Sequence, residues 1–317
     1  MNLLAPTTAT YTEQYSQMVR NIINYGYVAD PATVRGTYKS DGEIATTRKL
    51  LSQKFIVMPS DSGILSSKKL FARIAIMEML LFWQYKTNRR EDFKNANVKI
   101  WDEWFITDPD SEWYDTIGPA YGYQLGRRVR CITLDELTRS GHRLQYNPAF
   151  APYKKDAVLV DAVDHLIIKL KVNPGSRQNV VSLWNTEDID KMALPPCVWN
   201  TTWSTVGDVL NVEVGIRSND MGPGNPFNVF QYKILLMMIA QVTDLKVGVV
   251  TFNITDAHVY ERHVPVLLEQ LAQPPREQAI VRLNPAIRDF YDFTPNDVII
   301  EFPEGESEFV ATFDISV

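Results

Sequence analysis

The chain has 317 residues, of which 45% are hydrophobic, so it is long and apolar enough to bury a sizeable core. Its formal net charge of −6 excludes a broad basic footprint for nucleic acid, although local arginines could still bind a small anion. Two cysteines exclude a disulfide scaffold, the first ten residues do not form a secretory signal, and no apolar run reaches the ~20 residues that cross a bilayer. We therefore expect a soluble cytoplasmic protein with no membrane partner and no nucleic-acid partner.

Apolar spacing and turn residues predict mostly helices and loops in the first part of the chain. In chain order the expected elements are a helix at 12–25, a loop at 30–46, a helix from Ser66–Ser67 to 86, a loop with a short helix at 101–114, a helix at 156–171 and a strand at 179–185.

The second part predicts strands and helices without regular alternation. The expected elements are strands at 197–203 and 209–218, a helix at 226–242 that begins with proline, a strand at 246–255, a helix at 258–272 and further strands in the tail. Helices mixed with long strands in this way are typical of the α+β class. Because no Pro/Gly/Ser-rich linker divides the chain, we expect one domain over 1–317.

The turn at Gly207-Asp208 predicts a hairpin that brings a thiol near a guanidinium. A two-residue turn pairs Val206 with Val209, and extending that register places Cys197 opposite Ser218 and beside Arg217, unless a bulge shifts it by one residue. A nearby cation favours the thiolate, the nucleophilic form of cysteine. By itself a cysteine flanked by prolines is more often a small buried hydrophobe. For Cys131 the sequence indicates no comparable cationic partner, and we interpret it as a structural residue.

Three segments, Pro195-Pro196-Cys197, Arg217-Ser218-Asn219-Asp220 and Gly224-Asn225-Pro226-Phe227-Asn228, resemble in order and spacing the active-site core of the thymidylate synthase family. The resemblance runs from about Lys68 to Val317. It implies a large mixed β-sheet flanked by helices, a homodimer formed through the sheet face with shared active sites, and dUMP and 5,10-methylenetetrahydrofolate as substrate and cofactor.

The resemblance also implies a catalytic set. Cys197 would add to C6 of the pyrimidine, which makes C5 nucleophilic and splits a difficult substitution into easier steps. Glu78 lies in a strongly apolar run, where a carboxylate is costly unless it is paired or used, and burial would raise its pKa. In the family this glutamate moves protons, while residues matching Tyr121 and Asp220 also lie at the reacting centre.

Binding residues follow from the same resemblance. Arg217 and Ser218 would bind phosphate, joined by Arg177 from the partner subunit and a basic residue of the early loop, either Arg35 or Lys39. The family has a second arginine where this chain has Gln178, which weakens the clamp by one charge. We expect Asn228 to bind the base, and His258 and Tyr260 to bind the ribose. The residues expected to bind the folate are Lys68, Trp101, Trp104, Asp220, Gly224, Phe227 and Val317.

An amide such as that of Asn228 offers both a donor and an acceptor, which suits uracil, whereas members of the family that act on cytosine have aspartate there. Each of these residues could instead have a purely structural role. Asn228 could cap a helix, His258 could be a buried structural histidine, and Trp101 or Trp104 could be a core aromatic. The four histidines form no cluster with metal-ligand spacing, so we expect no metal site.

Three departures from the family pattern bear on the product. Val198 follows the cysteine where synthases have histidine, Ile216 stands where glutamine is usual, and the tail at 304–317 lacks the Tyr-x-Pro-His-Pro stretch. Because a changed lid would admit water, we expect a dUMP hydroxymethylase that makes 5-hydroxymethyl-dUMP, as in phage DNA modification, which would put the protein in a host cytoplasm. The alternatives are a thymidylate synthase and a non-catalytic member that binds nucleotide or RNA.

Overall fold

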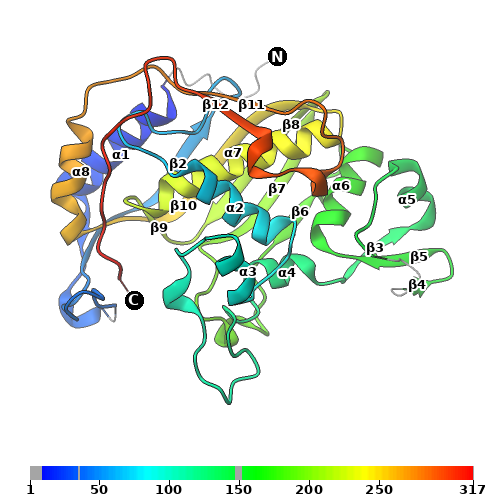
Figure 1. Ribbon diagram of the computed structural model, residues 1–317, viewed down its shortest axis with the longest axis horizontal. Helices are drawn as coiled ribbons and strands as arrows, with labels where there is room; N and C mark the ends of the chain where they lie inside the picture. The colour runs from blue at the N-terminus through cyan, green and yellow to red at the C-terminus, as the bar shows by residue number, and fades with distance from the viewer. Residues whose placement is uncertain (1–8, 35, 147–151, 317) are drawn as a thin grey trace.

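The computed structural model describes residues 9–34, 36–146 and 152–316, and a large mixed β-sheet runs through its centre (Figure 1). The strands, in spatial order, are β1 (Tyr27–Val28), β2 (Thr47–Val57), β10 (Lys246–Tyr260), β8 (Val209–Ile216), β7 (Val198–Val206) and β6 (Val180–Ser182), with β9 (Asn219–Asp220) also paired to β10. β10 runs parallel to β8 and β9, while the other neighbours are antiparallel. The expected α+β class and mixed sheet are confirmed.

Helices cover one face of this sheet. α1 (Tyr11–Tyr25) and α7 (Gly224–Val242) pack directly on it, and α2 (Ala72–Trp83) packs on α7 (Figure 1). α7 is apolar around most of its circumference, as Phe230, Ile234 and Leu235 illustrate, and such a helix is stable only inside a core. The strands meet it with alternate residues, so that Val212 and Val214 are buried while Glu213 between them is exposed.

A smaller antiparallel sheet forms a second layer of structure beside the first. It contains β3 (Arg130–Thr133), β5 (Ala157–Val160) and β4 (Pro152–Lys154), flanked by α5 (Leu134–Ser140) and α6 (Ala162–Val172), and encloses its own apolar cluster. Within the residues that the structure describes, the other helices and strands are α3 (Arg90–Asn95), α4 (Gly122–Gly126), α8 (Val264–Leu271), β11 (Ile280–Leu283) and β12 (Val298–Glu301). Short 3-10 turns lie at Pro31–Thr33, Asp102–Trp104, Ile189–Lys191, Glu261–His263, Phe290–Asp292 and Pro295–Asp297. Whether both layers make one domain stays a prediction.

For three helices the predicted first residue was wrong. The helix expected from Ser66–Ser67 begins at Ala72, after Phe71, with no side-chain cap. The helix expected from Asp156 begins only after Asp161, because 157–160 pair with β3 and the Asp161 carboxylate then caps the next turn. The helix expected from His258 begins at Val264, because β10 continues along β2 as far as Tyr260.

The tail was also partly wrong. Beyond β11 and β12 it runs irregularly along the surface instead of alternating as strands (Figure 1). Within the described ranges, no helix combines the length and the apolarity that crossing a bilayer requires.

Candidate active site

Cys197 lies immediately before β7, where a bulge changes the expected register. The hairpin pairs Val206 with Val209 as predicted, but the register shifts between Val198 and Asn200. As a result the Arg217 backbone N–H, rather than a Ser218 group, faces Cys197 and donates to its carbonyl over 2.9 Å. The one-residue shift left open by the sequence therefore occurs, and it places the arginine directly opposite the cysteine.

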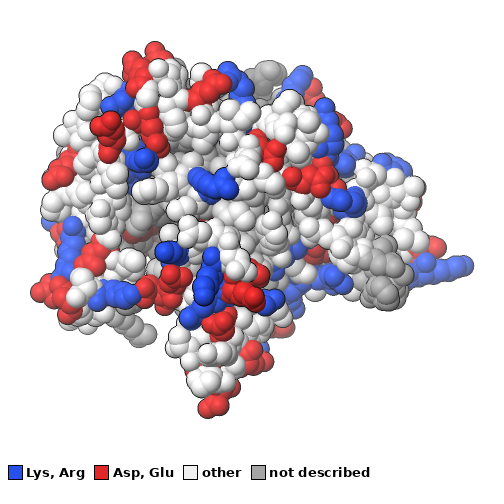
Figure 2. Space-filling model, in the orientation of Figure 1, with Lys and Arg blue, Asp and Glu red and all other residues white. Residues whose placement is uncertain are grey.

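The Arg217 guanidinium is fixed beside the thiol. Its Nε donates to the Pro196 carbonyl over 3.0 Å and one terminal nitrogen donates to the Pro195 carbonyl over 2.7 Å, so the two prolines before Cys197 anchor the cation. An arginine carries five N–H groups, and those not used here remain for an anion. Figure 2 shows basic and acidic side chains interspersed over one face of the protein, so this local arrangement matters more than any broad patch.

The pKa of the Cys197 thiol is raised, against the expectation that the cation would favour the thiolate. Burial is the largest cause, the charge of Arg217 and the hydrogen bond with Tyr121 partly offset it, and the Asp220 carboxylate raises it further. The effect of Arg217 therefore has the expected sign, but burial outweighs it. In the protein alone, burial therefore favours the protonated thiol.

Tyr121 holds the cysteine backbone from the other side. Its hydroxyl accepts a hydrogen bond from the Cys197 backbone N–H over 3.0 Å, and its ring stacks on Phe82 with centroids 4.7 Å apart. Tyr121 has φ +42°, a strained conformation for a residue with a side chain. The next residue, Gly122, lies so close to Thr87 that an added Cβ would sit 2.3 Å from its carbonyl oxygen. Packing therefore imposes the strain that aims the tyrosine.

Glu78 is buried in α2 and receives two hydrogen bonds. The indole N–H of Trp101 donates to one carboxylate oxygen over 2.6 Å, and the Gln231 amide donates to the other over 2.5 Å. Burial nevertheless raises the pKa of Glu78 to about 7, more than the two donors lower it. The expected upward shift is confirmed in direction. No feature of the sequence around Gln231 pointed to it as a partner.

Asp220 lies in β9 near two buried basic side chains, His263 and Lys68. One is the His263 imidazole, whose Nδ1 is buried, lacks a hydrogen-bond partner in the described part of the chain and lies 3.9 Å from the carboxylate. The other is Lys68, which donates to the Gly222 carbonyl over 3.0 Å and lies over the Phe313 ring. Burial lowers the pKa of Lys68 to about 8.

The expected folate residues divide into two groups. Trp101 is 7% exposed and packs among Phe82, Tyr121 and Trp104, so it is largely a core residue that also holds Glu78. Trp104 and Phe227 are only partly buried, and Gly224 starts α7. Val317 lies outside the described residues. Partly exposed aromatic rings suit a flat heterocycle, and a carboxylate such as that of Asp220 suits its N–H groups, as in a folate.

Residues expected to bind the ribose line one hollow of about 220 Å³. His258 and Tyr260 both contribute to it, together with Ser218, which was expected to bind the phosphate. Asp256 also lines the hollow, and its carboxylate lies 3.1 Å from Nδ1 of His258. Because alternate residues of a strand share a face, Asp256, His258 and Tyr260 point the same way from β10. The sequence reasoning missed Asp256 because it began a helix at His258. The pattern Asp-x-His-x-Tyr on a strand was the available clue.

Two expected phosphate ligands lie elsewhere in this chain. Arg177 is exposed in the turn before β6, and its guanidinium has no hydrogen bond or ion pair among the described residues. Lys39 forms an ion pair with Glu103, and its backbone N–H donates to the Ile315 carbonyl over 2.8 Å. Its alternative, Arg35, lies outside the described residues. Among the described residues, no group of three or more His, Cys, Asp or Glu side chains is placed so that it could bind a metal ion.

The tail is docked beside the hollow by contacts of its own. The Asp314 carboxylate accepts from Arg262 over 2.8 Å and from Ser40 over 2.5 Å, and the Nε2 of His263 donates to the Asp314 backbone carbonyl over 2.8 Å. Ser316 then lines the hollow. The altered tail is therefore held against the protein, with Ser316 at the hollow.

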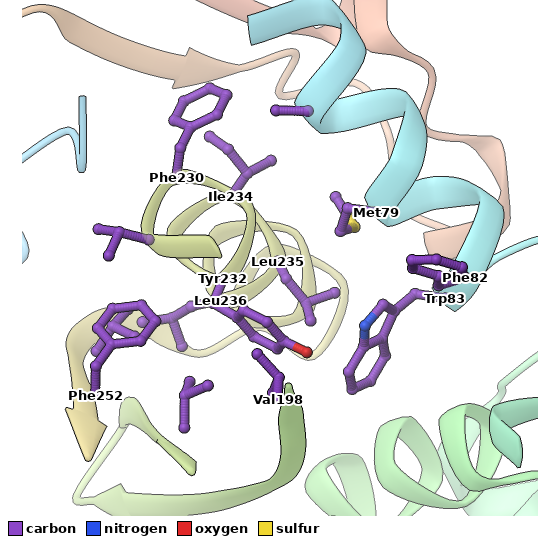
Figure 3. Close-up of a cluster of buried hydrophobic side chains, with 14 of the residues drawn as sticks. Met79, Phe82, Trp83, Val198, Phe230, Tyr232, Ile234, Leu235, Leu236 and Phe252 are labelled. Atoms are coloured by element: carbon purple, nitrogen blue, oxygen red, sulfur yellow. The ribbon is translucent and has the colours of Figure 1, made fainter. Parts of the chain in front are cut away.

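The other two departures lie in the core. Val198 and Ile216 are paired across β7 and β8, and they are 3% and 0% exposed. Figure 3 shows the Val198 side chain directed toward Tyr232 and Trp83, between the sheet and the helices. Both residues therefore belong to the core between the sheet and the helices.

Comparisons with known proteins agree with this arrangement. A family model described as Thymidylate synthase matches residues 13–307, further toward the N-terminus than the motifs alone indicated. The thymidylate synthase of Bacillus licheniformis is 39% identical over 308 residues, 97% of this chain and 99% of that protein. That of Bacillus phage phi3T is 38% identical over 297 residues, 93% and 96% respectively. The solved structure of thermostable thymidylate synthase A from Bacillus subtilis superposes with a TM-score of 0.83 at 38% identity, covering 98% of this chain and 100% of the other.

The fold and the cysteine site are those of an enzyme that transfers a one-carbon group to carbon. The chain belongs to the thymidylate synthase family, for which 5,10-methylenetetrahydrofolate is the one-carbon donor. The expected membership, enzyme class and cofactor are thus confirmed.

Proposed function

We propose that this protein is a thymidylate synthase that converts dUMP to dTMP. The observation that carries the proposal is the setting of Cys197, a thiol held between the guanidinium of Arg217 and the hydroxyl of Tyr121. The hydroxymethylase expected from the sequence has no support among the relatives, which are named thymidylate synthases, including the phage protein. A non-catalytic role is not favoured either, because Cys197, Tyr121 and Glu78, the residues that we propose for catalysis, lie in buried and hydrogen-bonded settings that suit that chemistry.

The proposed chemistry begins at the thiol. Cys197 loses its proton and forms a sulfur–carbon bond to C6 of the uracil ring, so that C5 becomes nucleophilic. Because burial raises the thiol pKa in the protein alone, the thiolate has to form as substrate binds, with Arg217 offsetting its charge. When bound, the folate would supply both the methylene unit and the hydride that reduces it to a methyl group, and it would leave as dihydrofolate. Loss of the C5 proton and cleavage of the sulfur–carbon bond then release the product and restore Cys197.

The remaining residues hold the substrate and manage its protons. The free donors of Arg217, with Ser218, suit the phosphate, and Asn228 suits the uracil edge. His258, oriented by Asp256, and Tyr260 suit the ribose hydroxyl. A carboxyl whose pKa is about 7, as in Glu78, can give and take a proton at uracil O4 near neutral pH.

The folate residues in this proposal are Lys68, Trp104, Asp220, Gly224, Phe227 and Val317, with Trp101 acting mainly by holding Glu78. Tail closure over them excludes water from the reacting C5 substituent.

The proposal includes a homodimer. The face of the large sheet that no helix covers bears the half-exposed Trp199 and the more exposed Leu51. An apolar sheet face is stable only when another layer packs on it, and a second subunit would supply that layer. Arg177, exposed and without a partner in the described part of the chain, would reach the phosphate of the other subunit. The cytoplasmic location expected from the sequence stays a prediction.

Trapping with 5-fluoro-dUMP and methylenetetrahydrofolate tests the thiol. We expect a covalent complex by mass spectrometry that Cys197→Ala abolishes and Cys131→Ala, at the exposed second cysteine, leaves intact. With dUMP, the product should be dTMP with one dihydrofolate formed per turnover. A product heavier by one oxygen, without dihydrofolate, would identify a hydroxymethylase instead, and no adduct in the wild-type protein would refute both activities.

A further inference from the structure

Four polar side chains form a hydrogen-bonded row that leads from the core to Asn228. The Tyr11 hydroxyl donates to Oδ1 of Asn225 over 2.7 Å, and Nδ2 of Asn225 donates to Oδ1 of Asn219 over 2.6 Å. Nδ2 of Asn219 then donates to Oδ1 of Asn228 over 3.1 Å. Tyr11 in α1 and Asn225 in α7 are 0% exposed and Asn219 in β9 is 1% exposed, so water does not compete for these bonds.

The row has a direction, and Tyr11 determines it. An amide can be turned over so that its oxygen and nitrogen exchange places, and turning over all three asparagines together would still leave each facing a suitable partner. In that reversed row, however, Asn225 would donate to the Tyr11 hydroxyl, and the Tyr11 O–H would lose the acceptor that it has in the structure. A buried donor without an acceptor is destabilising. The phenol at the closed end therefore keeps Oδ1 of Asn228 facing Asn219.

This direction matters at the open end. With Oδ1 turned toward Asn219, a second lone pair on that oxygen can accept the N3–H of uracil, while Nδ2 donates to O4. Cytosine presents the opposite pattern, an acceptor at N3 and a donor at its exocyclic amine, so it requires Asn228 to be turned over. Turning over Asn228 alone would set two Nδ2 groups against each other, and turning over the whole row leaves Tyr11 unsatisfied.

We propose that Tyr11, through Asn225 and Asn219, is a positioning residue that fixes the Asn228 amide and so makes the site prefer dUMP to dCMP. The inference rests on the proposed function, in which Asn228 contacts the base. It adds a specificity determinant that touches no substrate.

The test measures the dissociation constants of dUMP and dCMP by calorimetry, without folate and without turnover. In Tyr11→Phe we expect the preference for dUMP to fall by about tenfold, mainly because dCMP binds more tightly. The control is Tyr15→Phe, one turn along the same helix and also 0% exposed, whose hydroxyl donates to the Met221 carbonyl instead of to the row. It should leave the preference unchanged.

A second variant reverses part of the row. Asn225→Asp offers only acceptors once its carboxyl is ionised. Asn219 then has to turn its Nδ2 toward residue 225 and its Oδ1 toward Asn228, which presents the orientation that suits cytosine. The preference should fall further than in Tyr11→Phe.

The possible failures are distinct. If Asn228→Asp changes the preference but both Tyr11→Phe and Asn225→Asp, folded by circular dichroism, keep the wild-type ratio, the positioning role is refuted and the proposed function stands. If the wild-type protein binds neither nucleotide, the proposed function fails and the positioning role fails with it.

Discussion

Replacing Glu78 with glutamine should change how the stability of the protein depends on pH. Glu78 is 8% exposed, and its two oxygens accept from Trp101 and Gln231. Glutamine has nearly the same size as the protonated acid and carries no charge at any pH. One of its two terminal atoms cannot accept, so Glu78→Gln loses a hydrogen bond, but that loss is the same at every pH.

The sign and size follow from the raised pKa. In the unfolded chain the carboxyl ionises near 4.5, whereas in the folded protein burial keeps it protonated up to about 7. The folded state therefore binds the extra proton between these values, and the free energy of unfolding falls as pH rises through that window. Each pKa unit corresponds to about 1.4 kcal/mol, so wild type should lose about 3 kcal/mol relative to Glu78→Gln between about pH 4.5 and about pH 8.5.

Urea unfolding of both proteins across this pH range, followed by tryptophan fluorescence, measures the difference. The control is Glu187→Gln, at an exposed glutamate, which should give a curve parallel to wild type. If the Glu78→Gln and wild-type curves are themselves parallel, the buried carboxyl does not carry a raised pKa and cannot exchange protons near neutral pH in the way proposed.

Three further outcomes are expected. Arg177→Ala and Cys197→Ala should each be inactive as homodimers, and refolding them together should restore turnover, since one hybrid site keeps both residues; confirmed hybrids without activity would contradict a shared site. Gly122→Ala should lower the free energy of unfolding by about 2 kcal/mol, because its Cβ would meet a backbone carbonyl 2.3 Å away, whereas Gly175→Ala, which meets nothing within 4 Å, should change it little in urea titrations. Asp314→Ala should raise the KM for folate several-fold by loosening the tail while the Kd of dUMP stays the same, and faster proteolysis of the tail should accompany it.

Local chemistry explains what could be predicted from the sequence. The hairpin turn at 207–208 fixes which strands pair, so the meeting of Cys197 with Arg217 follows from counting residues. The bulge at Trp199 does not, because it depends on how the end of β7 fits the sheet, and it moved the pairing by one residue. Glu78 could be singled out because a carboxylate is conspicuous in an apolar helix.

Partners supplied by distant segments could not be predicted in the same way. Gln231 lies 153 residues from Glu78 and Tyr11 lies 214 residues from Asn225, so only the packing of α1, α2 and α7 brings them together. Propensity also failed where pairing overrode it: 258–260 stay in β10 because β2 lies alongside. The net pKa of Cys197 was missed for the same reason, since burial is a property of the whole fold.

The departures that suggested hydroxymethylation lose that meaning once they are located. A valine or isoleucine could admit water only if it lined the site, but Val198 and Ile216 are paired across β7 and β8 and are both buried, and the Val198 side chain points toward Tyr232 and Trp83 (Figure 3). They replace two polar side chains with an apolar pair, which a core position accepts without leaving an unsatisfied group. The tail lost a motif, yet Asp314 fastens it beside the hollow. The docked tail and the buried position of the changed pair therefore remove the argument for added water access, which supports the methylated product that we propose.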